Sequence, residues 1–128
     1  MSGTRTVLYD PQGLIEAELP LDRAPHEALV TAALAWTDPQ LQPRDYEQIA
    51  LQLTGYARAV AADVQRHALT LPKNNGRRAL AEVVLREAEG RLSVPLEGTA
   101  RCVQNRAQLV RALYARLDRL TAADPTAP

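Results

Sequence analysis

The residues of this chain best suited to bind an anion lie in the segment "ARCVQNRAQLVRALYARLDRL", residues 100–120. This segment carries arginines at positions 101, 106, 111, 116 and 119 against one acid, Asp118. Because a guanidinium group binds carboxylate or phosphate through parallel hydrogen bonds, the segment could bind nucleic acid or an acidic protein. The whole chain has no net charge, however, and residues 1–40 carry six acids against two arginines. The two regions could therefore neutralise each other instead.

Arg106 differs from the other arginines of this segment. At about 100° per residue it falls in the middle of the apolar arc of the helix, whereas the others fall outside that arc. A buried charge needs a partner, and Glu87 lies on the apolar side of the preceding helix at a similar depth. We therefore predict a buried Glu87–Arg106 pair. The alternative is that Glu87 pairs with Arg91, four residues on, and leaves Arg106 free for a ligand or partner.

Two polar residues, Tyr56 and His67, lie on the apolar stripe of one predicted helix. Together with Arg106 and Glu87 they could line an internal site for a small ligand. The simpler explanation for His67 is a histidine at the edge of the core, whose charge suits a helix C-terminus.

Arg77 and Arg78 stand at the start of the next predicted helix. Positive charge there opposes the helix dipole, so a bound anion would stabilise it. Two solvated arginines are the simpler interpretation.

The sequence lacks the common catalytic signatures. It contains no glycine-rich phosphate loop, no Cys-x-x-Cys and no His-Glu-x-x-His. A structural zinc needs four ligands, and this chain has two histidines and one cysteine, far apart. Ser2 and Ser93 have no histidine nearby in the sequence. We predict no catalytic residues, no metal and no cofactor, so metal-dependent and acyl-transfer enzymes are disfavoured.

Four helices are predicted to position these residues, and the fold class is all-α. Pro25 begins a short helix, with an exposed His26 in its first turn. Pro43 begins the clearest helix, roughly 43–70, in which an apolar residue recurs every three or four positions.

The other two helices follow short turns. Asn74 or Asn75 caps a helix over roughly 76–92, and Thr99 caps one that runs to about 121. The third helix is expected to bury one face, comprising Leu80, Ala81, Val84, Leu85, Ala88 and Leu92. Short connections favour antiparallel neighbours, which predicts an antiparallel helical bundle.

Residues 1–24 are predicted to be an extended N-terminal segment. Within it "TVLYDPQGLIEAEL" carries a type I turn signal at Asp10-Pro11-Gln12-Gly13, which favours a β-hairpin. Because an isolated hairpin is marginal, it would lie on the helices or pair with a second chain in a homodimer. Residues 25–121 form the bundle domain and residues 122–128 a disordered tail.

Composition limits the class of protein. With 128 residues, 46% of them hydrophobic, the chain suits one domain with a modest core. No apolar run approaches the ~20 residues that span a bilayer, so no membrane contact is expected. The single cysteine, Cys102, excludes an intrachain disulfide and fits a cytoplasmic location.

Residues 44–120, most densely "VQNRAQLVRALYARLDRL", resemble an uncharacterised family of small actinobacterial proteins labelled as natural-product biosynthesis proteins. The resemblance implies a helical fold and a link to secondary metabolism. It supplies no catalytic residues.

These observations predict a non-enzymatic accessory or regulatory protein that acts by binding another protein, either a different one or a second copy of itself in a homodimer. One alternative is a nucleic-acid-binding regulator that uses the basic C-terminal helix. Zero net charge disfavours that alternative without excluding it. Another alternative is a bundle that binds a small ligand at Arg106, Glu87, His67 and Tyr56.

Overall fold

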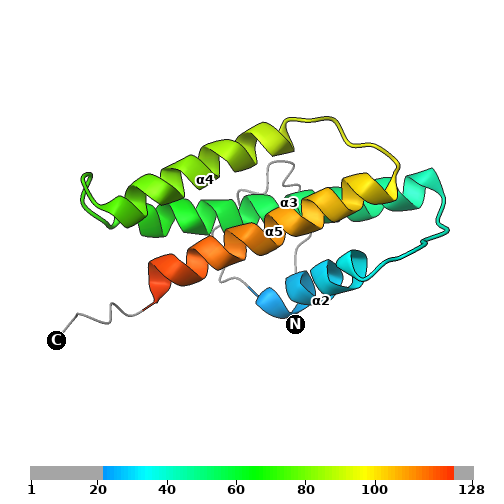
Figure 1. The fold of residues 1–128 in the computed structure, drawn as a ribbon, viewed down its shortest axis with the longest axis horizontal. Coiled ribbons are helices and arrows are strands. Elements are labelled where there is room, and N and C mark those ends of the chain that lie inside the picture. The colour runs from blue at the N-terminus through cyan, green and yellow to red at the C-terminus, as the bar shows by residue number, and fades with distance from the viewer. Residues whose placement is uncertain (1–21, 123–128) are drawn as a thin grey trace, which may run out of the picture.

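The computed structural model describes residues 22–122, which contain four α-helices and no strand. The helices are α2 (Arg23–Leu34), α3 (Pro43–Leu69), α4 (Gly76–Leu92) and α5 (Ala100–Thr121). Successive helices run in opposite directions, so α3 and α5 point the same way (Figure 1). The predicted all-helical bundle of four helices is confirmed. The predicted hairpin and residues 123–128 of the predicted tail lie outside the described residues.

Side chains that the sequence places at the helix starts explain where the helices begin. The Asn75 side chain accepts hydrogen bonds from the backbone of Arg77 and Arg78, and the Thr99 hydroxyl accepts one from Cys102. The first helix begins at Arg23 rather than at the predicted Pro25. The reason is Asp22, whose carboxylate accepts a hydrogen bond from Ala24 N–H and caps the helix two residues earlier.

The core lies along the contact between α3 and α5, which is the most extensive contact between helices. The largest fully buried side chains all belong to these two helices: Leu53, Val60, Val64, Val103, Val110 and Leu113. The helix α4 packs mainly on α3, through Ala81, Ala88 and Leu92, and touches α5 much less. The prediction that Leu80 is buried was wrong: Leu80 is 54% exposed, because the face of α4 that carries it turns away from α3.

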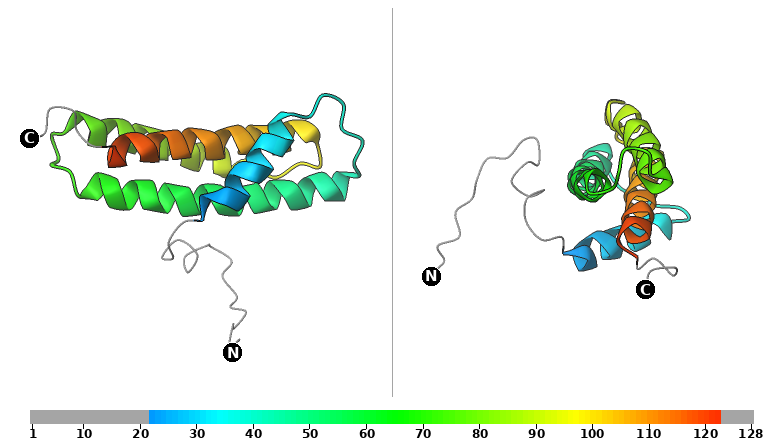
Figure 2. Two further views of the ribbon diagram at one scale, coloured as in Figure 1. Left: turned by 90° about the horizontal axis from the view of Figure 1, so that it is seen from below. Right: turned by 90° about the vertical axis from the view of Figure 1, so that its left-hand side faces the viewer.

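The helix α2 crosses the bundle obliquely and packs mainly on α5 (Figure 2). The amide of Gln104 on α5 donates to the carbonyls of Ala33 and Trp36, at 3.1 and 3.4 Å. The first carbonyl lies in the last turn of α2 and the second lies two residues beyond the end of that helix. The short helix is thus held by polar as well as apolar contacts.

Two connections are held against the N-terminus of α3. The Tyr46 hydroxyl donates to Pro39 O at 3.0 Å and accepts from Leu41 N–H at 3.1 Å, which fixes the α2–α3 connection. In the α4–α5 connection, Gly98 lies so close to Pro43 that an added Cβ would sit 2.7 Å from the Pro43 carbonyl oxygen. No helix within residues 22–122 combines the length and apolar character needed to cross a bilayer.

Candidate binding site

Arg106 is buried, with 5% of its surface exposed, as its place in the apolar arc predicts. Its Nη1 donates to the carbonyl of Arg91 at 2.9 Å, and its Nη2 donates to the carbonyl of Val94 at 2.7 Å. Both carbonyls belong to the end of α4 and the turn that follows it. The guanidinium therefore places positive charge at the negative end of the α4 dipole and adds a side-chain donor to two carbonyls at the end of that helix.

The predicted Glu87–Arg106 pair is wrong. Glu87 is exposed and its carboxylate lies 3.4 Å from the guanidinium of Arg91, four residues on. The depth argument assumed that α4 and α5 face each other closely, but both pack on α3 and their mutual contact is small. The alternative partner for Glu87 is confirmed, although Arg106 is not left free.

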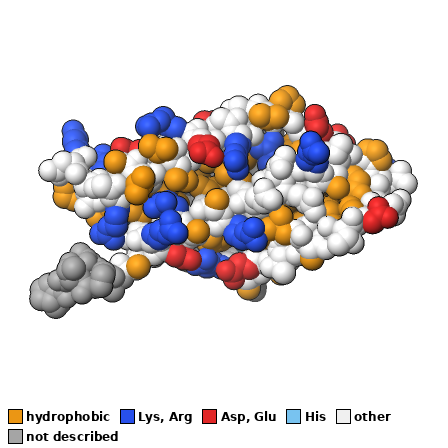
Figure 3. All heavy atoms as spheres, viewed as in Figure 1, with side chains coloured by type: hydrophobic (Ala, Val, Ile, Leu, Met, Phe, Trp, Pro, Cys, Tyr) orange, Lys and Arg blue, Asp and Glu red, His pale blue; other side chains and the backbone are white. Residues whose placement is uncertain are grey.

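A groove runs between α4 and α5 over the gap that their separation leaves. It has a volume of about 260 Å³, and its lining comprises Val84, Glu87, Ala88, Arg91, Leu109, Ala112, Ala115, Arg116 and Arg119. We call it the α4–α5 groove. Helical periodicity places Leu80 on the same side of α4 as Glu87. Figure 3 shows hydrophobic and basic side chains gathered over these two helices.

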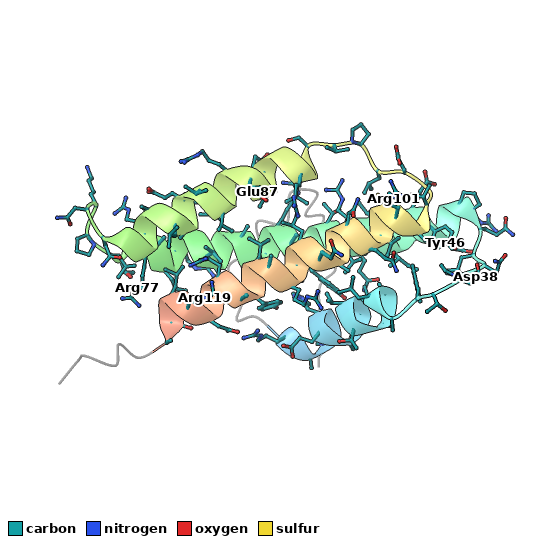
Figure 4. All side chains as sticks on the ribbon, viewed as in Figure 1. Asp38, Tyr46, Arg77, Glu87, Arg101 and Arg119 are labelled. Atoms are coloured by element: carbon teal, nitrogen blue, oxygen red, sulfur yellow. The ribbon has the colours of Figure 1, made fainter. Side chains whose placement is uncertain are left out.

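Two arginines of the α4–α5 groove have no acidic partner within residues 22–122. The Nε atom of Arg116 is buried and makes no hydrogen bond to any described residue. Asp118, which lies between Arg116 and Arg119 in the sequence, is instead bound by Arg23 at 2.6 Å. Figure 4 shows Arg119 near the end of α5 and Glu87 on α4. The groove thus combines an apolar floor with positive charge that its surroundings leave uncompensated.

Arg77 and Arg78, at the start of α4, have different surroundings. Arg78 donates through Nη1 to the carbonyl of Leu71 at 2.9 Å, and its Nε lies 3.3 Å from Glu82. It therefore satisfies a carbonyl that follows the C-terminus of α3. Arg77 is half-buried and forms no ion pair with a described acid. An anion at this helix start stays a prediction.

The four residues proposed to line one internal ligand site do not come together. Arg106 binds the end of α4, and Glu87 is exposed on α4 beside Arg91. His67 is 43% exposed at the side chain and lies 3.8 Å from Asp63 on its own helix. Tyr56 contacts α2 instead. That shared site was wrongly predicted, while a binding role for any single member of the set stays a prediction.

Tyr56 is partly buried and belongs to an aromatic cluster that links α2, α3 and α5. Its ring stacks on the His26 imidazole, with the ring centroids 3.8 Å apart. The Nδ1 atom of His26 is 2.6 Å from the Tyr114 hydroxyl, and the Arg23 guanidinium lies over the Tyr114 ring at 4.2 Å. The prediction that His26 is exposed was wrong, because only 5% of its surface is exposed. We call His26, Tyr56 and Tyr114 the aromatic cluster.

Burial sets the protonation states in and around the aromatic cluster. It lowers the pKa of His26 below its usual value, and the nearby charge of Asp22 opposes that shift only in part. Burial also raises the pKa of Tyr114 to about 12, against the opposing effect of the Arg23 charge. The hydrogen bond to Asp118 raises the pKa of Arg23 above its usual value. At neutral pH His26 and Tyr114 are therefore both uncharged, as expected for side chains buried in the core between α2 and α5.

The sequence contained a signal for His26 that the prediction did not use. His26, Val30 and Ala33 recur at helical spacing and are the buried residues of α2. Nothing comparable indicated Arg116. Its partly buried position depends on how far α4 stands from α5, which no local pattern records.

Comparisons of the chain with protein families, with curated proteins and with solved structures each found no match. Any link to natural-product biosynthesis therefore stays a prediction. The described residues also contain no group of three or more histidine, cysteine, aspartate or glutamate side chains placed to hold a metal ion.

Proposed function

We propose that this protein is a non-enzymatic accessory or regulatory protein that binds another protein, and that the α4–α5 groove receives an acidic amphipathic helix of that partner. The supporting observation is one groove that combines apolar side chains with arginines that no described acid neutralises. Following the resemblance of residues 44–120, we place this binding in natural-product biosynthesis.

The apolar surface around the groove supports a protein partner. Leu80 is 54% exposed and Val83 is 49% exposed, one turn or less before Val84 in the groove lining. Exposed apolar side chains that neighbour each other on one helix have an unfavourable hydration free energy, and a partner that covers them removes this cost. An amphipathic helix that lays its apolar face into such a groove buries them.

The charge of the α4–α5 groove determines which kind of partner helix can bind there. Arg116 and Arg119 line the α5 side of the groove, while the only acid in its lining, Glu87, is paired with Arg91. A partner with glutamate or aspartate beside its apolar stripe would give these arginines hydrogen-bonded partners. A basic helix would be repelled. The α5 lining extends from Leu109 to Arg119, about 15 Å at 1.5 Å per residue, which corresponds to about three turns.

A designed peptide tests the groove directly. The probe is a helical peptide of roughly 14 residues with leucines on one face and glutamates on the other. We expect it to bind with a Kd of about 10–100 µM. Its amide chemical-shift changes should concentrate on α4 and α5. A peptide with lysine in place of each glutamate should bind at least about tenfold more weakly.

Matched variants identify the surface that binds. Leu80→Glu lies beside the groove, whereas Leu51→Glu changes an equally exposed leucine, 55% against 54%, on α3. We expect Leu80→Glu and Arg116→Glu to weaken peptide binding at least about tenfold, and Leu51→Glu to leave it unchanged. Equal losses for the Leu80 and Leu51 variants would refute the groove as the binding surface.

A photo-crosslinking amino acid at residue 80 identifies the natural partner in the organism of origin, with residue 51 as the control position. We expect an adduct with another protein at residue 80 alone, through an acidic helix that binds again as a synthetic peptide. An adduct between two copies of this chain would show a homodimer and reject a separate partner. Adducts only with nucleic acid would reject the proposal altogether.

A further inference from the structure

A second cavity lies between the α4–α5 connection and the first turns of α5, next to the α4–α5 groove, with which it shares Arg91 and Leu109. Its volume is about 340 Å³, within the range of small-molecule sites. Arg106 lies in its wall, and Arg101, Asn105 and Gln108 line it from α5. Val94, Pro95 and Leu109 supply an apolar part of the lining.

Positive charge dominates this cavity. Three arginines line it, Arg91, Arg101 and Arg106, against one acid, Glu97. Arg101 lies in the first turn of α5 (Figure 4). It is exposed and forms no ion pair with a described acid. Arg106 uses one N–H of each terminal nitrogen for the carbonyls of Arg91 and Val94. A guanidinium has five N–H groups, so Arg106 can hold the turn and still donate to a ligand.

From this lining we infer a binding site for a small organic anion, with its carboxylate or phosphate group at Arg101 and Arg106 and a short apolar body against Val94 and Leu109. Arginine binds both kinds of anion through paired hydrogen bonds. The amides of Asn105 and Gln108 provide further donors and acceptors for the ligand. Because Arg106 is fixed by two hydrogen bonds, its guanidinium is already oriented before the ligand arrives.

The single cysteine of the chain reports on this cavity. Cys102 lines it, is half-buried, and its sulfur accepts a hydrogen bond from Glu97 N–H at 3.4 Å. A ligand in the cavity would cover the sulfur and slow its alkylation. Iodoacetamide is a suitable reagent, because it is uncharged and its approach does not depend on the arginines. With one cysteine in the sequence, the rate of alkylation refers to this position alone.

The experiment measures the alkylation rate of Cys102 against increasing concentrations of hexyl phosphate, hexanoate, inorganic phosphate and hexanol. We expect hexyl phosphate or hexanoate to slow the reaction at least about fivefold at saturation, with inorganic phosphate weaker and hexanol without effect. The stronger of the two anions tells whether the natural ligand carries phosphate or carboxylate. Isothermal titration with the same compounds gives an independent Kd.

Charge-reversal variants on one helix provide the control. Arg101→Glu removes a cavity cation, whereas Arg111→Glu reverses an exposed charge on α5 that does not line this cavity. We expect the Kd for the protecting anion to rise at least about tenfold in the first variant only. Protection by hexanol as strong as that by the anions, no protection by any anion, or equal effects of both variants would each overturn the inference. Both variants change exposed side chains, and a melting curve verifies that each is folded.

Discussion

Arg106 is a polar residue whose replacement should lower the stability of the fold. Its two hydrogen bonds to the carbonyls of Arg91 and Val94 are partly buried, and only 5% of the surface of Arg106 is exposed. We predict that Arg106→Met, which keeps an unbranched side chain, lowers the free energy of unfolding by roughly 1.5–3 kcal/mol. Glu87→Gln should stay within about 0.5 kcal/mol of the wild type, because Glu87 is exposed. Urea denaturation measures both values.

The same pair of variants separates two accounts of Arg106. If Glu87 were its true partner, Glu87→Gln would destabilise strongly and Arg106→Met combined with Glu87→Leu would recover much of the loss. The hydrogen bonds to carbonyls predict no such recovery, since the carbonyls of Arg91 and Val94 lose the guanidinium donor in the double variant as well. Recovery in that variant would contradict this structural role.

His26 should make stability depend on pH. Its folded pKa is lowered by burial, so between that value and the usual value near 6.5 the unfolded chain binds more protons than the folded one. The contribution of neutral His26 to the free energy of unfolding is therefore complete above about pH 6.5, and it decreases as the pH drops below that value. His67→Gln leaves His26 as the only histidine of the chain.

An NMR titration of the His67→Gln variant measures the pKa of His26 in the folded protein. We expect the His26 imidazole to titrate below about pH 6.5 and the unfolding free energy to fall as the pH drops below that value. A second variant, His26→Gln in the same background, should lose most of this pH dependence while folding less stably. A His26 resonance that titrates at or above pH 6.5 would show that burial does not dominate its surroundings.

At the scale of the helices, a side chain from a later helix donates hydrogen bonds at or just after the C-terminal end of an earlier helix. Gln104 does this for α2, Arg78 for the turn after α3, and Arg106 for α4. Each donates to carbonyls at or just beyond a helix end, and two of the three carry the positive charge that the helix dipole favours. The arginines of this chain therefore serve turns as well as surfaces, so their number overstates the charge available for binding.

Gly98 provides the test of how the connections pack. An alanine there would place its Cβ 2.7 Å from the Pro43 carbonyl oxygen, which is backbone and cannot swing away. We predict that Gly98→Ala destabilises by about 1–3 kcal/mol. Gly55→Ala, a change within α3, is the control, since nothing lies within 4 Å of its added Cβ. It should stabilise by about 0.5–1 kcal/mol through helix propensity. Thermal melts of the two variants that shift in the same direction would contradict this packing.

For the whole molecule, the distribution of charge disfavours a nucleic-acid-binding role. The chain has no net charge, and of the arginines on α5, Arg106 is buried and Arg116 is partly buried. We predict a Kd weaker than about 100 µM for a random DNA duplex at physiological salt. Fluorescence anisotropy at two salt concentrations measures it. Binding tighter than about 1 µM, with a steep loss on added salt, would make the basic face of α5 a nucleic-acid interface.

The positions of the helices were predictable because they depend on local features. Pro43, Asn75 and Thr99 mark helix starts through their own backbone and side-chain geometry, and all three lie at the predicted boundaries. The apolar arc of α5 likewise identified its buried face, including the burial of Arg106. Each of these features is contained within a few turns of one segment, so periodicity and capping suffice.

The partners of the polar residues were decided by the tertiary structure. A helical pattern shows which face is buried but leaves open which neighbour covers it and at what distance, because many rotations of packed helices bury similar apolar area. Because α4 stands apart from α5, Glu87 does not reach Arg106, Leu80 is exposed, and a groove lies beside Arg116. The crossing of α2 brought His26 to Tyr114, a residue 88 positions later. Such contacts join segments far apart in the chain, and only the packing of the whole core selects them.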